Sequence, residues 1–449
     1  MAPAARAPVS ERFAAGRVWL VLLAAAAAVL LVTALLNRAS RPVTPADTEA
    51  QAERYVHLAL VFGRLRDGEV DSYFGPAALE RAQEGDPDDL DGLKRQVGGL
   101  VADLATPGEE ADEMRRVHLR KLTQGLREAI KAGEGGFKAD FFGEAKWVYG
   151  MDRPSAADGE RWQAARAELE KLLPGEGPLV RRADAFRARF VVPMEQRKAL
   201  FDKALAECRA RTRAQWAMPE GERLEVEWTD SVPAAWHRYH GDYRSSLRIN
   251  RQALALPGQA IDLACHEGYP GHHAQFTMME AAAGPKGLTV EDRIMLLRSP
   301  GSVVREGAAE AGVDTVFPAD ERLDFLRGTL FPMAGLDPAE AERYARFEAL
   351  MRQLSGASLP ILARYRDGEQ NRADAADALM REALVSSPGP LLDFADRYGA
   401  YVTGYTIAHD RVAAVLDRNC GTRWSALQGV AIHPEAALLP LSSSKPAVL

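Results

Sequence analysis

The segment HEGYPGHH, residues 266–273, constrains the fold of this chain more than any other stretch of its sequence. It lies within residues 260–279, whose apolar spacing predicts a helix. Pro270 and Gly271 interrupt that pattern, because proline within a helix costs roughly 3 kcal/mol and glycine about 1 kcal/mol relative to alanine. A local rule broken this strongly often marks a functional site. The sequence therefore predicts a bent helix with histidines on both sides of the bend.

The same segment resembles the pattern H-E-x-x-H, in which two histidines one helical turn apart bind zinc and the glutamate activates water. Here two extra residues precede the second histidine. On an unbroken helix His266 and His273 would lie about 10.5 Å apart along the axis, which is too far for one ion. A bend that absorbs the two extra residues would bring His272 to the ligand position. We therefore favour His272 over His273, and expect the other histidine beside the ligands or against substrate.

Glu306 is the candidate for the third ligand. It stands in a small and apolar stretch, VVREGAAE, where a buried acid is costly unless it is paired or bound to a metal. Glu310 lies one turn later on the same face, where it could accept the free N–H of a ligand histidine and fix its tautomer. Two histidines and one glutamate leave zinc a position for water, and Glu267 would take a proton from that water. Iron is the alternative metal, because the same ligands suit it.

The segment HEGYPGHHAQF, together with the later REGAAE, resembles the bacterial family known as domain of unknown function 885. Members of that family carry a similar HE-x-x-PGHH and a downstream EG, and the resemblance runs from about Tyr239 to Tyr405. The family is similar to mostly helical metallopeptidases of the gluzincin type. The resemblance implies a helical fold around a deep cleft, with His266, His272 and Glu306 as ligands and Glu267 as base. After Glu306-Gly307 this chain has alanines, where the family usually has a bulky aromatic residue.

Helical spacing dominates the rest of the chain, so we expect a mainly α domain over residues 51–433. Alternation of apolar and polar residues predicts a small strand pair, 224–228 and 245–250, just ahead of the motif. Residues 434–449 are rich in proline and serine and predict a frayed tail. The predicted helices are 77–104, 109–132, 156–173, 180–215, 260–279, 300–316, 338–356, 374–384 and 390–418.

The amino terminus contains 19 uncharged residues, 18–36, which is long enough to cross a bilayer as a helix. Arg6, Arg12 and Arg17 precede this run, so residues 1–17 are expected to stay in the cytoplasm. Residues 37–50 form a linker with two prolines. We favour an uncleaved signal anchor in a bacterial cytoplasmic membrane, with a cleaved signal peptide as the alternative. Either reading exports the domain, with the lipid bilayer as a partner through residues 18–36.

Several further residues have two possible roles. Tyr401, Tyr405 and His409 share a spacing of four on the predicted late helix, where a tyrosine hydroxyl could donate to an oxyanion or simply pack in the core. The aromatic patch from Trp236 to Tyr243 could line a substrate site or pack. Cys265 could be a reactive thiol, or a buried free cysteine, and one Cys208–Cys420 bridge is possible.

Together these features predict a zinc-dependent hydrolase of peptide or small amide substrates. The alternatives are a non-peptide amide or ester hydrolase, and an inactive membrane-anchored binding protein of the same fold. The formal net charge of -7 and the absence of a basic stripe argue against nucleic acid as a partner.

Overall fold

The chain is described here by a computed structural model that covers residues 47–105, 113–133, 140–231, 234–419 and 421–438. Helices dominate and the strands form two small sheets, so the prediction of a mainly α fold is confirmed. The predicted membrane segment 18–36 lies outside the described residues. Among the residues that are described, no helix is long and apolar enough to span a bilayer.

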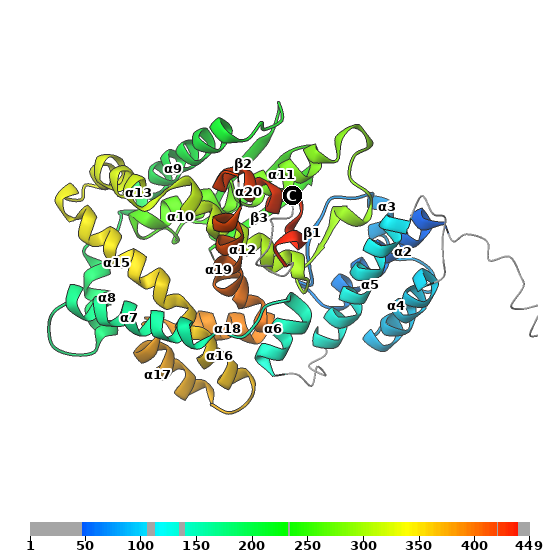
Figure 1. The fold of residues 1–449 in the computed structure, drawn as a ribbon, viewed down its shortest axis with the longest axis horizontal. Helices are drawn as coiled ribbons and strands as arrows, with labels where there is room; N and C mark the ends of the chain where they lie inside the picture. The colour runs from blue at the N-terminus through cyan, green and yellow to red at the C-terminus, as the bar shows by residue number, and fades with distance from the viewer. Residues whose placement is uncertain (1–46, 106–112, 134–139, 232–233, 420, 439–449) are drawn as a thin grey trace, which may run out of the picture.

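An amino-terminal lobe contains its own hydrophobic core, and it lies at one end of the molecule in Figure 1. Tyr55, Leu58, Ala59 and Phe62 recur at helical spacing and are all buried in this core, since they share one face of their helix. Asp47 caps that helix by accepting from the backbone N–H groups of the first turn. The elements of the lobe are α2 (Thr48–Leu65), β1 (Val70–Tyr73), α3 (Ala77–Glu80), α4 (Leu90–Ala105), α5 (Glu113–Gly133) and β5 (Ile294–Leu296).

The remaining elements form the main lobe around a second and larger core, except that η3 packs on α2 of the amino-terminal lobe. In chain order they are α6 (Phe141–Tyr149), α7 (Ala156–Leu172), α8 (Leu179–Ala188), α9 (Met194–Gln215), β2 (Arg223–Thr229), β3 (Ala235–Gly241), β4 (Arg244–Asn250), α10 (Pro257–Glu267), α11 (His272–Ala282), η2 (Gly284–Lys286), η3 (Glu291–Arg293), α12 (Pro300–Val316), α13 (Ala319–Phe325), η4 (Leu326–Leu330), α14 (Phe331–Met333), η5 (Pro338–Glu340), α15 (Ala341–Leu354), η6 (Ser355–Ala357), α16 (Ser358–Arg366), α17 (Arg372–Glu382), α18 (Pro388–Tyr398), η7 (Gly399–Tyr405), α19 (Ile407–Arg418), α20 (Arg423–Ile432) and η8 (Pro434–Leu438).

Some predicted boundaries are wrong, and proline or glycine explains most of them. The predicted helix 180–215 is two helices, because Pro193 disfavours helical backbone at Val192 and instead begins α9. The predicted helix 77–104 also divides, into α3 and α4, on either side of the turn that contains Gly85 and Pro87. At the ends, α2 begins inside the predicted linker and η8 occupies the start of the predicted frayed tail.

The predicted strand pair is part of a three-stranded sheet with the order β2-β4-β3. The first two strands pair in parallel and the last two are antiparallel. The missed strand β3 contains Trp236 and Tyr239, whose alternation of exposed and buried side chains was obscured by its many aromatic and titratable residues. As a result, residues 245–250 form the central strand, and β3 is an edge of the sheet.

Helix α12 runs through the middle of the main lobe, and nearly all of its residues are buried. It packs against α10, α19 and α20, and the alanines that follow Glu306 allow these helices to approach closely. Gly307 is required there, because a Cβ atom at this position would lie 2.4 Å from the carbonyl carbon of Ala408 in α19. The sequence EGAAEA is therefore explained by packing on three sides of one helix.

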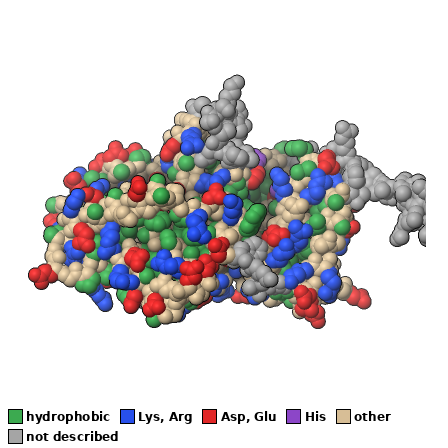
Figure 2. Space-filling view, turned by 60° about the horizontal axis from the view of Figure 1, so that its bottom comes forward, with side chains coloured by type: hydrophobic (Ala, Val, Ile, Leu, Met, Phe, Trp, Pro, Cys, Tyr) green, Lys and Arg blue, Asp and Glu red, His purple; other side chains and the backbone are tan. Residues whose placement is uncertain are grey.

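Charged side chains of both signs are interspersed over the face of the molecule seen in Figure 2, on the amino-terminal lobe as well as on the main lobe. This mixture agrees with the modest net charge of the chain.

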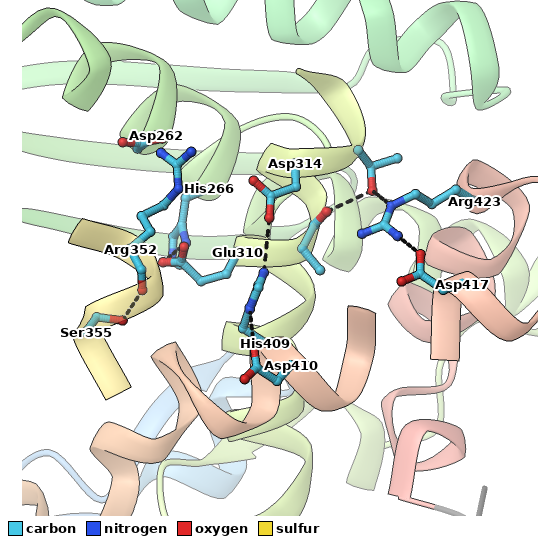
Figure 3. Close-up of polar contacts among 12 residues, drawn as sticks. Asp262, His266, Glu310, Asp314, Arg352, Ser355, His409, Asp410, Asp417 and Arg423 are labelled. Carbon is cyan, nitrogen blue, oxygen red and sulfur yellow. Dashed lines mark hydrogen bonds and ion pairs between the residues drawn. The ribbon is translucent and has the colours of Figure 1, made fainter. Parts of the chain in front are cut away.

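The predicted late helix 390–418 is wrong as one continuous element. Gly399 has a φ of 59° and ends α18, a conformation that favours glycine, and the 3-10 helix η7 precedes α19. His409 therefore does not share a face with Tyr401 and Tyr405. Instead its two ring nitrogens lie 3.1 Å from Asp314 of α12 and 3.0 Å from Asp410, as Figure 3 shows.

This contact makes the stability of the α12–α19 pair depend on pH. Burial disfavours the charged imidazole, but the bonds to Asp314 and Asp410 outweigh it and raise the pKa of His409 from 6.5 to about 9. Since the folded pKa is the higher one, the stabilisation is complete below pH 6.5 and disappears as the pH rises through 9. We expect His409→Asn to lower the free energy of unfolding by about 1–2 kcal/mol at pH 6.5.

Urea unfolding of the two proteins between pH 6 and 10 measures this difference. It should shrink toward zero at the alkaline end, and Asp314→Asn should show the same trend. A difference that stays constant over this range would contradict the assignment.

Candidate metal centre

The break between α10 and α11 places two histidines on one side of the chain. The backbone N–H of Gly271 donates to Cys265 at 3.0 Å, and that of Ala274 donates to Gly268 at 3.1 Å. Each bond spans six residues, two more than the four of an α-helix, so the turn absorbs the two inserted residues. The Tyr269–Pro270 peptide bond within it is cis. The prediction of a bend at Pro270-Gly271 is confirmed.

Gly271 is the residue that allows this turn to close. A Cβ atom at this position would lie 1.7 Å from the carbonyl oxygen of His266, so every other residue is excluded without a shift of the backbone. The turn therefore needs its glycine for close approach and not for a positive φ, since its φ is -72°.

His266, His272 and Glu306 come together at this turn. Their ligand atoms all lie within 4.8 Å of one another, and they could hold a metal ion. The Nε2 atom of His266 is 3.2 Å from Oε2 of Glu306, and Nε2 of His272 is 3.5 Å from Oε1. The structure thus brings together the three side chains that the sequence predicted as ligands.

The state of the Glu306 carboxylate fits a bound cation. Burial opposes its charge, but His272 and His266 hold its pKa well below the usual value, so it is ionised. Its Oε2 atom is buried and accepts no hydrogen bond among the described residues, although Nε2 of His266 lies 3.2 Å away. A buried carboxylate oxygen that accepts no hydrogen bond is costly, and a cation held with the two imidazoles would satisfy it.

Two neighbours orient the ligands. The Nδ1 atom of His266 lies 3.2 Å from Oε1 of Glu310, one turn after Glu306 on α12, and Figure 3 shows these two side chains side by side. This leaves Nε2 of His266 directed at the cluster, as predicted. On the other side, the hydroxyl of Tyr401 donates to Oε1 of Glu306 at 2.8 Å. Tyr401 therefore positions a ligand, and this hydroxyl is already engaged.

Tyr405 has a freer hydroxyl than Tyr401. Its ring stacks on His266 with centroids 6.3 Å apart, the residue is 38% exposed, and no hydrogen bond of its hydroxyl is found within the described ranges. Of the two predicted tyrosines, Tyr405 is the one available to donate to a ligand.

His273 does not join the cluster, so the prediction that it lies beside the ligands or on substrate is wrong. It is fully buried on the other side of α11, where Nε2 is 2.8 Å from Glu222 and Nδ1 is 2.8 Å from Ser245. Glu222 also accepts from Tyr269 at 2.6 Å. The buried carboxylate of Glu222 thus holds both Tyr269 and His273. It keeps His273 on the side of α11 away from the cluster, while His272 faces the cluster.

A cleft opens beside the cluster, with a cavity volume of about 200 Å³. Glu267 lines it, and burial raises the pKa of its carboxyl group against the opposing charges of His266 and His272. Residues from both lobes form the walls: Asp71, Ser72, Ala235, Trp236, His237, His266, Glu267, His272, Phe276, Met295, Leu297, Ser302, Arg305, Glu306, Phe394, Tyr398, Tyr401 and Tyr405.

Of the aromatic patch from Trp236 to Tyr243, Trp236 and His237 line the cleft. Sequence reasoning missed two residues of the site: Asp71, which lines the cleft from a strand far from the motif, and Glu222, which lies under the bend. No local pattern distinguishes either of them from an ordinary strand or loop residue. Desolvation in the cleft and the carboxylate of Glu306 raise the pKa of Asp71 to about 6.

Both predictions for the cysteines are wrong. Cys208 of α9 forms a disulfide with Cys265, so Cys265 is not a thiol and Cys208 does not pair with Cys420. The bond ties α9 to the residue just before His266. It therefore fixes the helix that carries the first ligand and the general-base candidate.

Comparisons with known proteins leave the family of this chain open. No protein-family model matches it, and no curated protein matches it. One similar solved structure is a protein from Colwellia psychrerythraea described as a "putative lipoprotein", with 13% identity and a TM-score of 0.46. The match covers 78% of this chain and 68% of that one. The likeness is too distant to assign a family, and membership of family 885 stays a prediction.

Metal content tests the cluster directly. We expect the full-length protein, dialysed against trace zinc, to retain about one ion per chain, because a site of this type holds one ion. His266→Ala and Glu306→Gln should each retain almost none. Elemental analysis gives the stoichiometry, with the exposed His240→Ala as the matched control. Full retention by both ligand variants would contradict the site.

The disulfide makes a separate prediction about stability. Replacing Cys208 and Cys265 together by alanine should lower the free energy of unfolding by about 2–4 kcal/mol, since the bridge closes a long loop. Urea unfolding with and without reductant measures this. The parent protein should weaken under reductant while the double variant does not, and equal sensitivity of the two would exclude the bridge.

Proposed function

We propose that this chain is an exported zinc-dependent hydrolase that cleaves peptide bonds. The observation that carries the proposal is the buried Glu306 carboxylate between two imidazoles, with a second carboxylate, Glu267, lining the same cleft. A merely structural zinc site is closed by four protein ligands and has no use for an adjacent base. Three ligands with an open side are typical of catalytic sites.

Zinc is the metal that this ligand set favours, since two imidazole nitrogens and one carboxylate in a closely spaced group suit it well. When bound, the ion supplies Lewis acidity, which lowers the pKa of water to roughly 7 and polarises a carbonyl group. Iron is the alternative, and the elemental analysis described above distinguishes the two.

The residues of this chain then have distinct roles in hydrolysis. Glu267 takes a proton from the attacking water and delivers it to the leaving nitrogen when the carbon–nitrogen bond breaks. Tyr405 donates its hydroxyl to the oxygen that becomes negative as the carbonyl carbon turns tetrahedral. Glu310 and Tyr401 keep His266 and Glu306 in place, because Oε1 of Glu310 lies 3.2 Å from Nδ1 of His266 and the Tyr401 hydroxyl donates to Oε1 of Glu306.

The edge strand β3 favours a peptide over a small amide or ester. Its residues Ala235, Trp236 and His237 line the cleft, and within the described residues it pairs on one side only, with β4. An extended peptide can add to such an edge through main-chain hydrogen bonds. Residues 245–250 are not available for such pairing, because β4 has a neighbour on both sides.

Export is supported by the Cys208–Cys265 bridge, since disulfides persist in oxidising compartments outside the cytoplasm. We propose that residues 18–36 anchor the chain in a bacterial cytoplasmic membrane with the hydrolase on the outer side.

Glu267→Gln tests the proposed function. The variant keeps the size of the side chain but removes the base, so we expect peptide hydrolysis to fall by about 100- to 10,000-fold with the metal content unchanged. Fluorogenic peptide libraries provide the assay, with small esters and amides alongside. A parent protein that binds zinc yet cleaves none of these substrates would favour the inactive binding protein instead.

Tyr405→Phe separates the tyrosine that acts on substrate from one that only packs. We expect kcat to fall by about 100-fold while KM changes little, since the hydroxyl acts on the transition state. Tyr365→Phe, which removes a hydroxyl from a tyrosine that does not line the cleft, is the matched control. An unchanged kcat for Tyr405→Phe would remove this residue from the mechanism.

A further inference from the structure

Asp71 is a carboxylate that the amino-terminal lobe contributes to the cleft of the main lobe. In the pairing of β1 with β5, Val70 stands opposite Leu296 and Ser72 opposite Met295. Asp71 between them has no partner, so it is the extra residue of a β-bulge. Bulges occur often beside active sites, where they redirect one side chain. Asp71 at this bulge is exposed and lines the cleft, and the next residue, Ser72, is buried and lines it as well.

The Asp71 carboxylate has no direct partner. No described residue forms a hydrogen bond or an ion pair with it, although the cleft also contains the guanidinium of Arg305. That group is engaged elsewhere, with the carbonyl of Ala431 at 3.3 Å, the sulfur of Met279 at 2.9 Å and the face of Phe276. Asp71 lines the same cleft as His266, His272 and Glu306.

The backbone around Asp71 is held firmly. Glu69, two residues earlier, is buried and forms an ion pair with the buried Arg298, which lies just before α12. The carbonyl of Glu69 accepts from the N–H of Leu297 at 2.9 Å. These contacts join the backbone around Asp71 to the segment that leads into α12, the helix that carries Glu306. Such a carboxylate is preorganised for a ligand, and needs little ordering when one binds.

We propose that Asp71 binds an ammonium group of the substrate, which is the free α-amine beside the bond that is cleaved. This rests on the proposed function and adds the substrate class: peptides with an unblocked amino terminus. A carboxylate without an ion pair in a partly enclosed cleft attracts a cation that can donate hydrogen bonds. The cavity of about 200 Å³ is smaller than the roughly 300–1,000 Å³ of sites for larger ligands, which favours a terminal residue over the middle of a chain.

Binding of metal-chelating probes tests this without any turnover. The full-length protein loaded with zinc is titrated with leucine hydroxamate and with N-acetylleucine hydroxamate, which differ in the α-amine. We expect the free amine to bind at least about tenfold more tightly, and Asp71→Asn to reduce that ratio below about threefold. Asp67→Asn, a change of the same kind at an exposed position outside the cleft, should leave the ratio unaltered.

A second pair of probes identifies the source of the ammonium group. N-acetyl-lysine hydroxamate and N-acetylnorleucine hydroxamate differ in a side-chain ammonium only. One outcome is a preference for the lysine probe that disappears in Asp71→Asn, without any preference for the free α-amine. It would show that Asp71 binds a lysine side chain and not a terminal amine, and it would overturn the proposal.

The remaining outcomes are equally decisive. Equal binding of the two leucine probes to the parent protein, or no binding of either, overturns the role of Asp71. Loss of zinc from Asp71→Asn also overturns it, since the residue would then be a ligand. A protein that discriminates between the two leucine probes but hydrolyses no peptide would contradict the proposed hydrolase function and still support the ammonium site at Asp71.

Discussion

The arrangement of this protein depends on the turn between α10 and α11, where two backbone hydrogen bonds each span six residues. Without this turn, the two extra residues would carry His272 away from His266. Without Gly271 the turn could not close, because a side chain there would overlap the carbonyl oxygen of the first ligand residue. A helix that is costly to break is broken here, and the interactions around the break offset that cost.

Those interactions come from three directions. Glu222 bonds both Tyr269 inside the turn and His273 after it, and Arg209 and Arg213 compensate its buried charge. The disulfide fixes Cys265 just before the turn. From the third side, α12 supplies Glu306 and Glu310, and small residues along this helix allow it to pack closely against α10 and α19. Each contact that shapes the bend thus also limits where a metal ion could sit.

The sequence was most informative where chemistry requires particular residue types in a short span. His266, Glu267, His272, Glu306 and Glu310 could be named because their types and spacing fit a metal site, and the bend could be predicted from Pro270-Gly271. His273 could not be assigned, since its direction depends on Glu222, a distant residue with no pattern around it. The role of Asp71 could not be predicted either, because a bulge and the pairing of two distant segments, β1 and β5, place it in the cleft.

Long-range pairing explains the errors in the fold as well. The strand β3 was not predicted because its many aromatic residues obscured the alternation, and its edge position follows only from the order of the sheet. The disulfide between Cys265 and Cys208 of α9 could not be predicted from the spacing of the cysteines. Local propensity, by contrast, was enough for most helices, and it failed where a proline or glycine divided one predicted helix into two.

The metal centre formed by His266, His272 and Glu306 is tested most directly by anomalous diffraction at the zinc edge from a crystal of the zinc-loaded protein. We expect one strong peak at about 2.0–2.2 Å from Nε2 of His266, Nε2 of His272 and a carboxylate oxygen of Glu306. A peak elsewhere, or a zinc ion bound to His273 in place of His272, would contradict it.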